Sequence, residues 1–182
     1  MLFSYFEPIT YGGKTTTDIF RNYRAYFNRV AVKYKLKTYY IKGNPRPEQL
    51  AYNLYGNQQL YWILLMCNNN YDPFHGWIES QEASYQSAIQ RYRDIGGEQV
   101  LYHVDANGEK YYNLVEKPGF PGHWYDKGDK LMKHLQYNGP LSAVDTLEDS
   151  ILRNEVKREI KIIAPRDVDS FLSAFIREME KA

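Results

Sequence analysis

The chain has 182 residues, which suits one ordinary domain or a small module with elaborate flanks, but not two full enzyme domains. Hydrophobic residues make up 43% and charged residues 25% of the chain, values that are typical of globular proteins and favour neither disorder nor a fibrous repeat. The formal net charge of +1 provides no basic field for phosphates, so duplex nucleic acid is not expected as a partner.

Cysteine usage and hydropathy indicate the compartment. The single cysteine, Cys67, excludes an internal disulfide framework and is interpreted as a buried small hydrophobe, which favours a reducing environment. The start of the chain lacks the regions of a secretory signal, and the apolar run Tyr61 to Cys67 is far shorter than the ~20 residues of a membrane span. We therefore expect no membrane partner and assembly in the cytoplasm.

The aromatic content is the unusual feature of the composition, at 16% with 18 tyrosines. Tyrosine gives a large, stiff contact area with a polar tip and is enriched at protein interfaces. A tyrosine-rich core and a carbohydrate-stacking surface are the alternatives. We predict interface use, and the candidate interface residues are Phe3, Tyr5, Phe6, Tyr39, Tyr40, Tyr52, Tyr55, Tyr61, Phe74, Trp77, Phe120, Trp124 and Tyr125.

The first predicted region, residues 1–35, is an N-terminal arm and a helix. Residues 1–14 mix aromatic residues with a proline and the pair Gly12-Gly13, so we expect an extended arm with a glycine hinge that cannot fold alone. Thr17 can cap a helix. That helix would carry one apolar stripe, made of Ile19, Tyr23, Tyr26, Phe27 and Val30.

The second region, residues 36–80, has the order strand, helix, glycine, helix. Residues 36–43 are rich in β-forming types and predict a strand. A helix over 48–55 is expected to end at Gly56, which suits a left-handed cap, and a nearly all-apolar helix over 58–68 follows.

The third region, residues 81–140, begins with a helix over 81–94 that Ser80 can cap. A β-hairpin is then predicted, because the β-rich runs VLYHV and KYYNL are joined by the turn residues 105–108.

The stretch 115–140 is rich in glycine and proline with aromatic residues between them, and it predicts a long loop. Loops of this length are usually functional or ordered against a partner, and Trp124 and Tyr125 would be its anchors. Asp126 and Asp129 flank a glycine here, but their spacing does not fit an EF-hand, so a turn that presents Trp124 to another surface is favoured.

The last region, residues 141–182, predicts a helix over 142–156, a strand ending at Ala164 and an amphipathic helix over 167–181. The apolar face of that final helix consists of Phe171, Leu172, Phe175, Ile176 and Met179. The predicted fold class is therefore α+β.

Residue patterns for catalysis are missing from the sequence. No nucleophile, phosphate-binding or paired-carboxylate signature is present, although 22 acidic residues leave a hydrolase open as an alternative. The four histidines lie far from one another and from Cys67, and none has the spacing of a metal-ligand pair. We expect no enzyme activity, no metal and no cofactor.

The second region resembles a LysM module, a small βααβ-type fold, in the segment YYIKGNPRPEQLAYNLYGNQQLYWILLMCNNNYDP. LysM modules bind glycan chains, so this resemblance implies peptidoglycan binding as an alternative function. The usual Gly-Asp-Thr entry is replaced by residues 43–47, and no clear closing strand follows the Tyr71-Asp72-Pro73 sequence. We therefore expect the small fold to bind protein instead.

Nearly the whole chain resembles the small baseplate wedge proteins of T-even-type contractile-tailed phages. The blocks that carry this resemblance are MLFSYFEPI, TDIFRNYRAYF, GWIESQEASYQ, YHVDANGEKYYNL, WYDKGDK and IKIIA, together with the LysM-like segment. The resemblance implies a virion protein of the tail baseplate that joins wedge subunits and links neighbouring wedges into a sixfold ring around the hub. Its implied partners are the sheath-initiating subunit and the larger wedge subunits.

Overall fold

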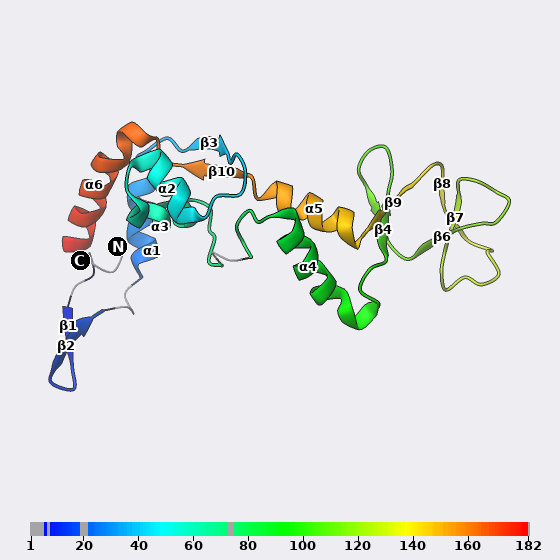
Figure 1. Ribbon diagram of the computed structural model, residues 1–182, viewed down its shortest axis with the longest axis horizontal. Coiled ribbons are helices and arrows are strands. Elements are labelled where there is room, and N and C mark those ends of the chain that lie inside the picture. Colours follow the sequence, from blue (N-terminus) through cyan, green and yellow to red (C-terminus); the bar gives the residue numbers. More distant parts are fainter. Residues whose placement is uncertain (1–5, 7, 19–21, 73–74, 182) are drawn as a thin grey trace. The chain divides into compact units, whose positions relative to one another are not determined.

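The computed structural model describes residues 6, 8–18, 22–72 and 75–181 (Figure 1). The chain divides into two compact units: unit 1 joins Met1–Glu79 to Glu155–Ala182, and unit 2 is Ser80–Asn154. Unit 2 is thus inserted into the sequence of unit 1. The described residues mix helices with small antiparallel sheets, which confirms the predicted α+β class.

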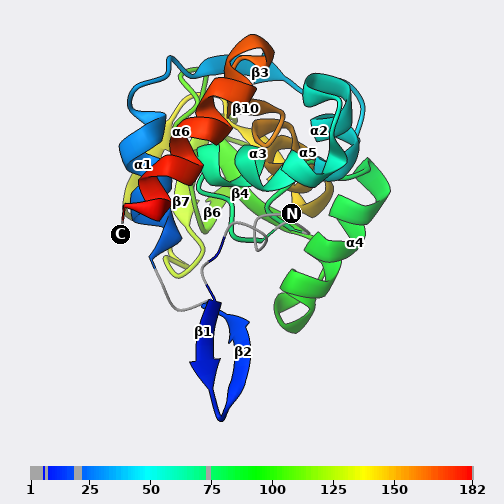
Figure 2. The same ribbon diagram turned by 90° about the vertical axis from the view of Figure 1, so that its left-hand side faces the viewer.

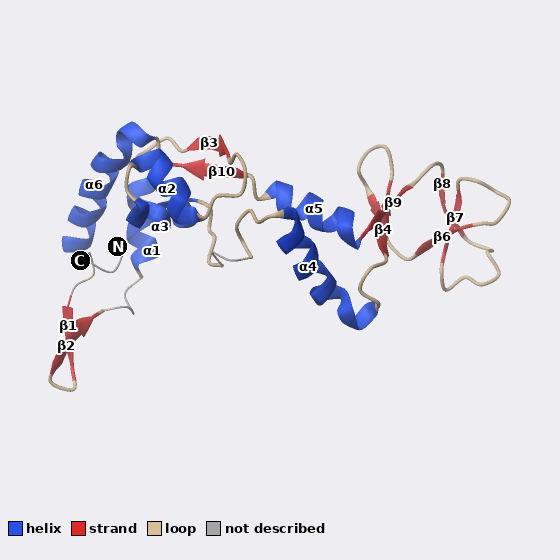
Figure 3. Ribbon diagram, viewed as in Figure 1, coloured by secondary structure: helices blue, strands red, loops and turns tan. Residues whose placement is uncertain are grey.

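Helices make up most of the regular structure of unit 1 (Figure 3). In chain order its elements are β1 (Pro8–Tyr11), β2 (Lys14–Thr17), α1 (Tyr23–Ala31), β3 (Lys37–Tyr40), α2 (Pro47–Tyr55), a 3₁₀ turn (Gln58–Leu60), α3 (Tyr61–Cys67), β10 (Glu159–Ile162), a second 3₁₀ turn (Pro165–Asp167) and α6 (Val168–Glu180).

For the described residues from Pro8 on, the N-terminal predictions of an extended arm and a Thr17 cap are wrong, while residues 1–5 and 7 of the arm lie outside the described part of the chain. β1 and β2 pair in an antiparallel hairpin that includes Thr17. Gly12 and Gly13 form its turn with φ of +56° and +75°, because a two-residue hairpin turn with positive φ at both positions favours glycine. The cap of α1 is Asn22, whose side chain accepts a hydrogen bond from the Ala25 amide at 3.1 Å. Ile19 of the predicted stripe lies outside the described residues.

The predicted strand, helix and second helix of the second region are confirmed as β3, α2 and α3 with its preceding 3₁₀ turn. Pro47 occupies the first turn of α2, where its missing N–H costs no hydrogen bond. Gly56 ends the helix with φ +69°, and its amide donates to the Tyr52 carbonyl at 2.8 Å.

The strand that completes this strand–helix–helix arrangement comes from far along the chain. β10 pairs antiparallel with β3, so that Ile160 lies opposite Tyr39. Asn68 holds the other side of β10, because its side chain donates to the Lys161 carbonyl at 2.8 Å and accepts from the Lys161 amide at 2.7 Å. The apolar core between the strands and helices consists of Ile41, Leu50, Ala51, Leu64, Trp77, Ile78, Ile160 and Ile162.

A second core of unit 1 lies between α1, α3 and α6. Phe27 of α1 is 2% exposed, and its ring lies 5.2 Å from Phe171 and 6.2 Å from Phe175, edge to face. Trp62 of α3 lies 5.6 Å from Phe175. Edge-to-face aromatic contacts add stability beyond the area that they bury. The predicted amphipathic helix over 167–181 is confirmed as α6.

Unit 2 contains two helices and two three-stranded sheets. Its elements are α4 (Gln81–Tyr92), a 3₁₀ turn (Arg93–Ile95), β4 (Val100–Val104), β5 (Lys110–Tyr111), β6 (Leu114–Glu116), β7 (His123–Asp126), β8 (Leu135–Asn138), β9 (Ser142–Asp145) and α5 (Thr146–Val156), whose last two residues belong to unit 1. The Ser80 cap of α4 and the hairpin that β4 forms with β5 confirm two predictions.

Two predictions for unit 2 are corrected. The stretch 115–140, predicted as a loop, contains the sheet β6–β7–β8. Its strands have three or four residues each between glycine and proline turns, so they are too short to show a clear alternation. The helix expected from Ser142 begins at Thr146, because Ser142–Asp145 pair with β4 instead. Asp145 accepts a hydrogen bond from the Glu148 amide at 2.8 Å at the start of α5.

The buried face of α5 is polar. Thr146 donates to the Gly97 carbonyl at 2.8 Å. Asp149, 1% exposed, accepts from the Tyr102 hydroxyl at 2.9 Å and forms an ion pair with Arg153 at 2.7 Å. Buried polar groups are retained where their hydrogen bonds are satisfied, so this network fixes α5 against β4 in one orientation.

Candidate protein-binding surface

The structure places the predicted interface aromatics in four groups. Phe3, Tyr5 and Phe74 lie outside the described residues. The exposed ones are Tyr40, Tyr52 and Phe120; the half-buried ones are Phe6, Tyr39, Tyr55 and Tyr61; and the buried ones are Trp77, Trp124 and Tyr125.

The two described tryptophans among these candidates are internal, which corrects the prediction that Trp124 is presented to another surface. Trp77 is 3% exposed and donates to the Pro45 carbonyl at 2.8 Å. Trp124 is 8% exposed and donates to the Gly139 carbonyl at 2.9 Å. Each indole packs inside its own unit, where its N–H donates a hydrogen bond to a backbone carbonyl.

Two of the tyrosines also bind within unit 1. The half-buried Tyr55 donates to the Ile163 carbonyl at 3.0 Å, and burial raises the pKa of its hydroxyl. The exposed Tyr40 donates to the Glu159 carboxylate at 2.8 Å, which joins the side chains of β3 and β10, and this hydrogen bond raises the pKa of Tyr40. Their rings therefore contribute to the chain's own structure.

One face of the sheet β6–β7–β8 is apolar and exposed at both flanks. Val115, Tyr125 and Leu135 lie opposite one another across the three strands, so they share this face. Val115 is 37% and Leu135 45% exposed beside the buried Tyr125. The Lys117 ammonium lies 4.7 Å from the Phe120 ring centroid and 5.8 Å from that of Tyr125, which places Phe120 next to the same face. We call Val115, Lys117, Phe120, Tyr125 and Leu135 the outer sheet face.

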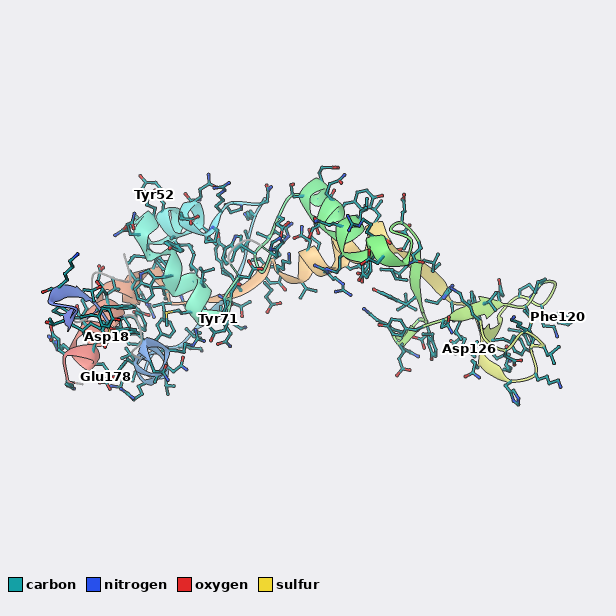
Figure 4. The ribbon with its side chains drawn as sticks, turned by 90° about the horizontal axis from the view of Figure 1, so that it is seen from below. Asp18, Tyr52, Tyr71, Phe120, Asp126 and Glu178 are labelled. Atoms are coloured by element: carbon teal, nitrogen blue, oxygen red, sulfur yellow. The ribbon has the colours of Figure 1, made fainter. Side chains whose placement is uncertain are left out.

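The opposite face of this sheet is packed within unit 2. The register of β7 and β8 shifts between Trp124 and Tyr125, so Trp124 lies opposite Tyr137 while Tyr125 lies opposite Leu135. The rings of Trp124 and Tyr137 meet the side chains of the neighbouring sheet: His103 is 4.6 Å from Trp124, and Tyr111 is 4.8 Å from Tyr137. A sheet with one face packed and an apolar second face is typical of a surface that binds another protein. In Figure 4, Phe120 lies in the loop between β6 and β7.

Sequence reasoning missed part of the exposed surface. Val115 and Leu135 were assigned to a loop, and only their pairing with β7 reveals the face that they share. Other strongly exposed aromatic residues that were not predicted are Tyr11 at 80%, Tyr71 at 80% and Tyr112 at 62%. The high tyrosine count was the available signal, but it does not say which rings are exposed.

The surroundings of His103 predict that the stability of unit 2 depends on pH. Burial, with the nearby Lys127 as a second cause, lowers the pKa of His103 below its ordinary value of 6.5. Its buried Nδ1 has no hydrogen-bond partner within the described part of the chain. The unfolded chain therefore binds this proton at higher pH than the folded chain does, so the contribution is complete above about pH 6.5 and is lost as pH falls below it.

We expect the free energy of unfolding of unit 2 to fall as pH is lowered from 7 to 5, and to fall less in His103→Phe. Urea unfolding at several pH values, followed by hydrogen exchange of β4 and β7 amides, measures this slope. An identical slope in the substituted chain would show that other groups cause it.

Cys67 is half-buried at the end of α3, and burial raises the pKa of its thiol to about 12. The thiol is therefore protonated at neutral pH and is a poor nucleophile. Across residues 6, 8–18, 22–72 and 75–181, no cluster of three or more histidine, cysteine or acidic side chains is arranged to hold a metal ion. Nor is any helix of these ranges long and apolar enough to cross a membrane.

Comparison with known proteins decides the family. The sequence profile described as "Base plate wedge protein 53" matches residues 1–178. The chain belongs to this family. "Baseplate wedge protein gp53" of Enterobacteria phage T4 is 57% identical to it over 191 aligned positions, which cover 100% of the chain and 97% of that relative. The family that the sequence blocks predicted is therefore confirmed, and the match includes both units.

Proposed function

We propose that the chain is a structural component of a phage tail baseplate, which binds other wedge subunits and links neighbouring wedges into a sixfold ring. The observation that carries the proposal is the outer sheet face of unit 2, where the apolar side chains of Val115, Phe120 and Leu135 are exposed, in a chain of the wedge protein family. The partners would be the sheath-initiating subunit and the larger wedge subunits. The protein would assemble in the host cytoplasm and act in the virion without catalysis or a cofactor.

The outer sheet face has the chemistry of a protein-binding site. Burial of a large apolar side chain contributes about 1.5–3 kcal/mol, and Val115, Phe120 and Leu135 each have a third or more of their surface left to bury. Lys117 adds a positive charge over the Phe120 and Tyr125 rings, and charged groups at an interface contribute more to the orientation of the partner than to affinity.

A linking role requires more than one binding surface, and unit 1 supplies another. Tyr52 and Tyr71 are 63% and 80% exposed, and Figure 4 shows them on different sides of unit 1. Exposed tyrosines are frequent energetic centres of interfaces. Two units with separate cores and separate exposed rings suit a subunit that is held by several neighbours at once.

The outer sheet face can be tested with two leucines of nearly equal exposure. Leu135 on β8 is 45% exposed, and Leu152 on α5 is 48% exposed, both in unit 2. We expect Leu135→Lys to weaken copurification with wedge subunits at least tenfold, because a buried interface must then desolvate an ammonium. Leu152→Lys should bind as the unmodified chain does.

Size-exclusion chromatography with co-expressed wedge subunits gives the readout, and circular dichroism of each variant reports its fold. If the Leu135→Lys chain binds wedge subunits as well as the unmodified chain does, the outer sheet face is not the binding surface. Failure of the unmodified chain to join any wedge complex would sink the proposed function itself.

A glycan-binding role is the second candidate, and one feature of unit 1 favours it. The order β3, α2, α3 with β10 paired to β3 supports the LysM-like module proposed from the sequence, in which β10 would take the place of the closing strand. A hollow of about 450 Å³ lies along α2, and its lining combines one exposed aromatic ring with amides and a carboxylate: Pro45, Glu48, Gln49, Tyr52, Asn53 and Gln58. Sugars are bound by such combinations of stacking and hydrogen bonding.

Retention on purified peptidoglycan tests this candidate. Binding that Tyr52→Ala abolishes and Tyr71→Ala leaves intact would support it. No retention of the unmodified chain at high protein concentration would remove it.

A further inference from the structure

The β1–β2 hairpin has almost no buried side chains of its own. Ile9 is half-buried, and every other residue of the two strands is exposed. A two-stranded hairpin is marginally stable in water unless a third strand or a packed face supports it. Figure 2 shows β1 and β2 as a two-stranded ribbon joined by a tight turn. The hairpin therefore has backbone and side chains available for a partner.

Both ends of the hairpin are held to the first residue of α1. Phe6, which precedes β1, stacks on Tyr23 with ring centroids 3.4 Å apart. The Tyr23 hydroxyl donates to the carbonyl of Asp18, which follows β2, at 2.5 Å. This shared anchor fixes the base of the hairpin, while all of residues 8–17 except the half-buried Ile9 remain exposed.

The two edges of the hairpin differ in their backbone chemistry. In an antiparallel pair, hydrogen-bonded residue pairs alternate with pairs whose N–H and C=O groups point outward. Tyr11 and Lys14 flank the two-residue turn and form a hydrogen-bonded pair, so the outward-pointing pairs are Thr10 with Thr15 and Pro8 with Thr17.

Pro8 has no N–H at its outward position, which blocks the free edge of β1 against a further strand. The free edge of β2 has no such block, because Thr15 and Thr17 each present an N–H and a C=O outward. The open edge of the hairpin is therefore β2.

We propose that the free edge of β2 (Lys14–Thr17) pairs with an exposed edge strand in another baseplate protein and adds the hairpin to that protein's sheet. This inference rests on the proposed function, since it takes the partner from the baseplate. A second copy of the chain held by this edge alone is the weaker choice, because two four-residue strands with no other contact bury far less than the ~1,200 Å² that a stable specific interface needs. A baseplate protein that is already bound to another surface of the chain holds its edge strand near β2. The effective concentration of that strand is then high, so even a small strand pairing can form.

The pair Thr10 and Thr15 provides a matched test, because the two residues face each other across the hairpin and both point their N–H outward. Thr15→Pro removes an N–H from the open edge of β2, and Thr10→Pro removes one from the edge that Pro8 already blocks. Both substitutions place proline at an edge position where no hydrogen bond within the hairpin is lost. We expect Thr15→Pro to reduce incorporation into wedge complexes at least fivefold and Thr10→Pro to leave it unchanged.

Residue-resolved hydrogen exchange of the full chain supplies the second readout. On assembly with wedge subunits, the amides of Thr15 and Thr17 should become protected by at least tenfold, while the Thr10 amide should not. Normal incorporation of Thr15→Pro, equal loss in both variants, or protection in the isolated chain through self-association would each overturn the proposal. If the unmodified chain itself joins no wedge complex, the proposed function fails, which is a distinct result.

Discussion

Replacement of Trp124 by alanine is expected to lower the free energy of unfolding of unit 2 by about 3–5 kcal/mol. The indole is 8% exposed, lies against the His103 ring and donates to the Gly139 carbonyl. Its removal leaves a cavity between the two sheets and an unmatched carbonyl beside Tyr137. Urea unfolding with hydrogen exchange of β7 amides measures the loss.

Trp124→Phe is the matched control, because it keeps an aromatic ring and loses the N–H. It should cost about 1–2 kcal/mol for the lost hydrogen bond and smaller volume. Assembly should weaken in Trp124→Ala only under conditions in which unit 2 unfolds. A folded Trp124→Ala chain that fails to bind wedge subunits would restore the prediction that Trp124 contacts a partner.

Replacement of Phe175 by alanine is the second large effect, with an expected loss of about 3–5 kcal/mol in the free energy of unfolding of unit 1. Phe175 is fully buried on α6 and contacts the rings of Phe27 and Trp62 from α1 and α3. One side chain thus joins three helices, and few neighbouring atoms can move into the space that it leaves.

Ile176→Ala on the same helix is the control, since Ile176 is only half-buried. Ile176→Ala should lower the free energy of unfolding of unit 1 by no more than half as much as Phe175→Ala does. Hydrogen exchange of the full chain should show faster exchange for α1 and α6 amides in Phe175→Ala, with α4 amides unchanged. Similar effects on both units would contradict the separation of their cores.

The sequence was sufficient for elements whose signals are local. Pro47 and Gly56 mark the two ends of α2 through backbone restrictions that act within one turn, and Ser80 marks the start of α4 in the same way. The apolar repeat through Phe171 and Phe175 predicts α6 because 3.6 residues make one turn.

Long-range pairing limited what could be predicted from the rest of the sequence. β10 pairs with β3 although all of unit 2 lies between them in the sequence. No residue pattern near Tyr71 indicates where the strand that pairs with β3 lies. The strands β6, β7 and β8 are stabilised by their neighbours more than by their own composition. For the candidate surface, the tyrosine surplus predicts contact area but cannot separate Phe120, which is exposed, from Tyr125, which is buried.

The hydrogen bond from Tyr40 to Glu159 joins residues 119 positions apart, and this separation has a consequence for biosynthesis. A ribosome completes all of unit 2 before it adds the strand that unit 1 needs. Domains generally fold during synthesis as soon as their sequence is available, and contacts that are distant in sequence form slowly. The inserted unit is therefore expected to fold first on the nascent chain, and a messenger truncated before codon 159 would encode a product that lacks both β10 and α6.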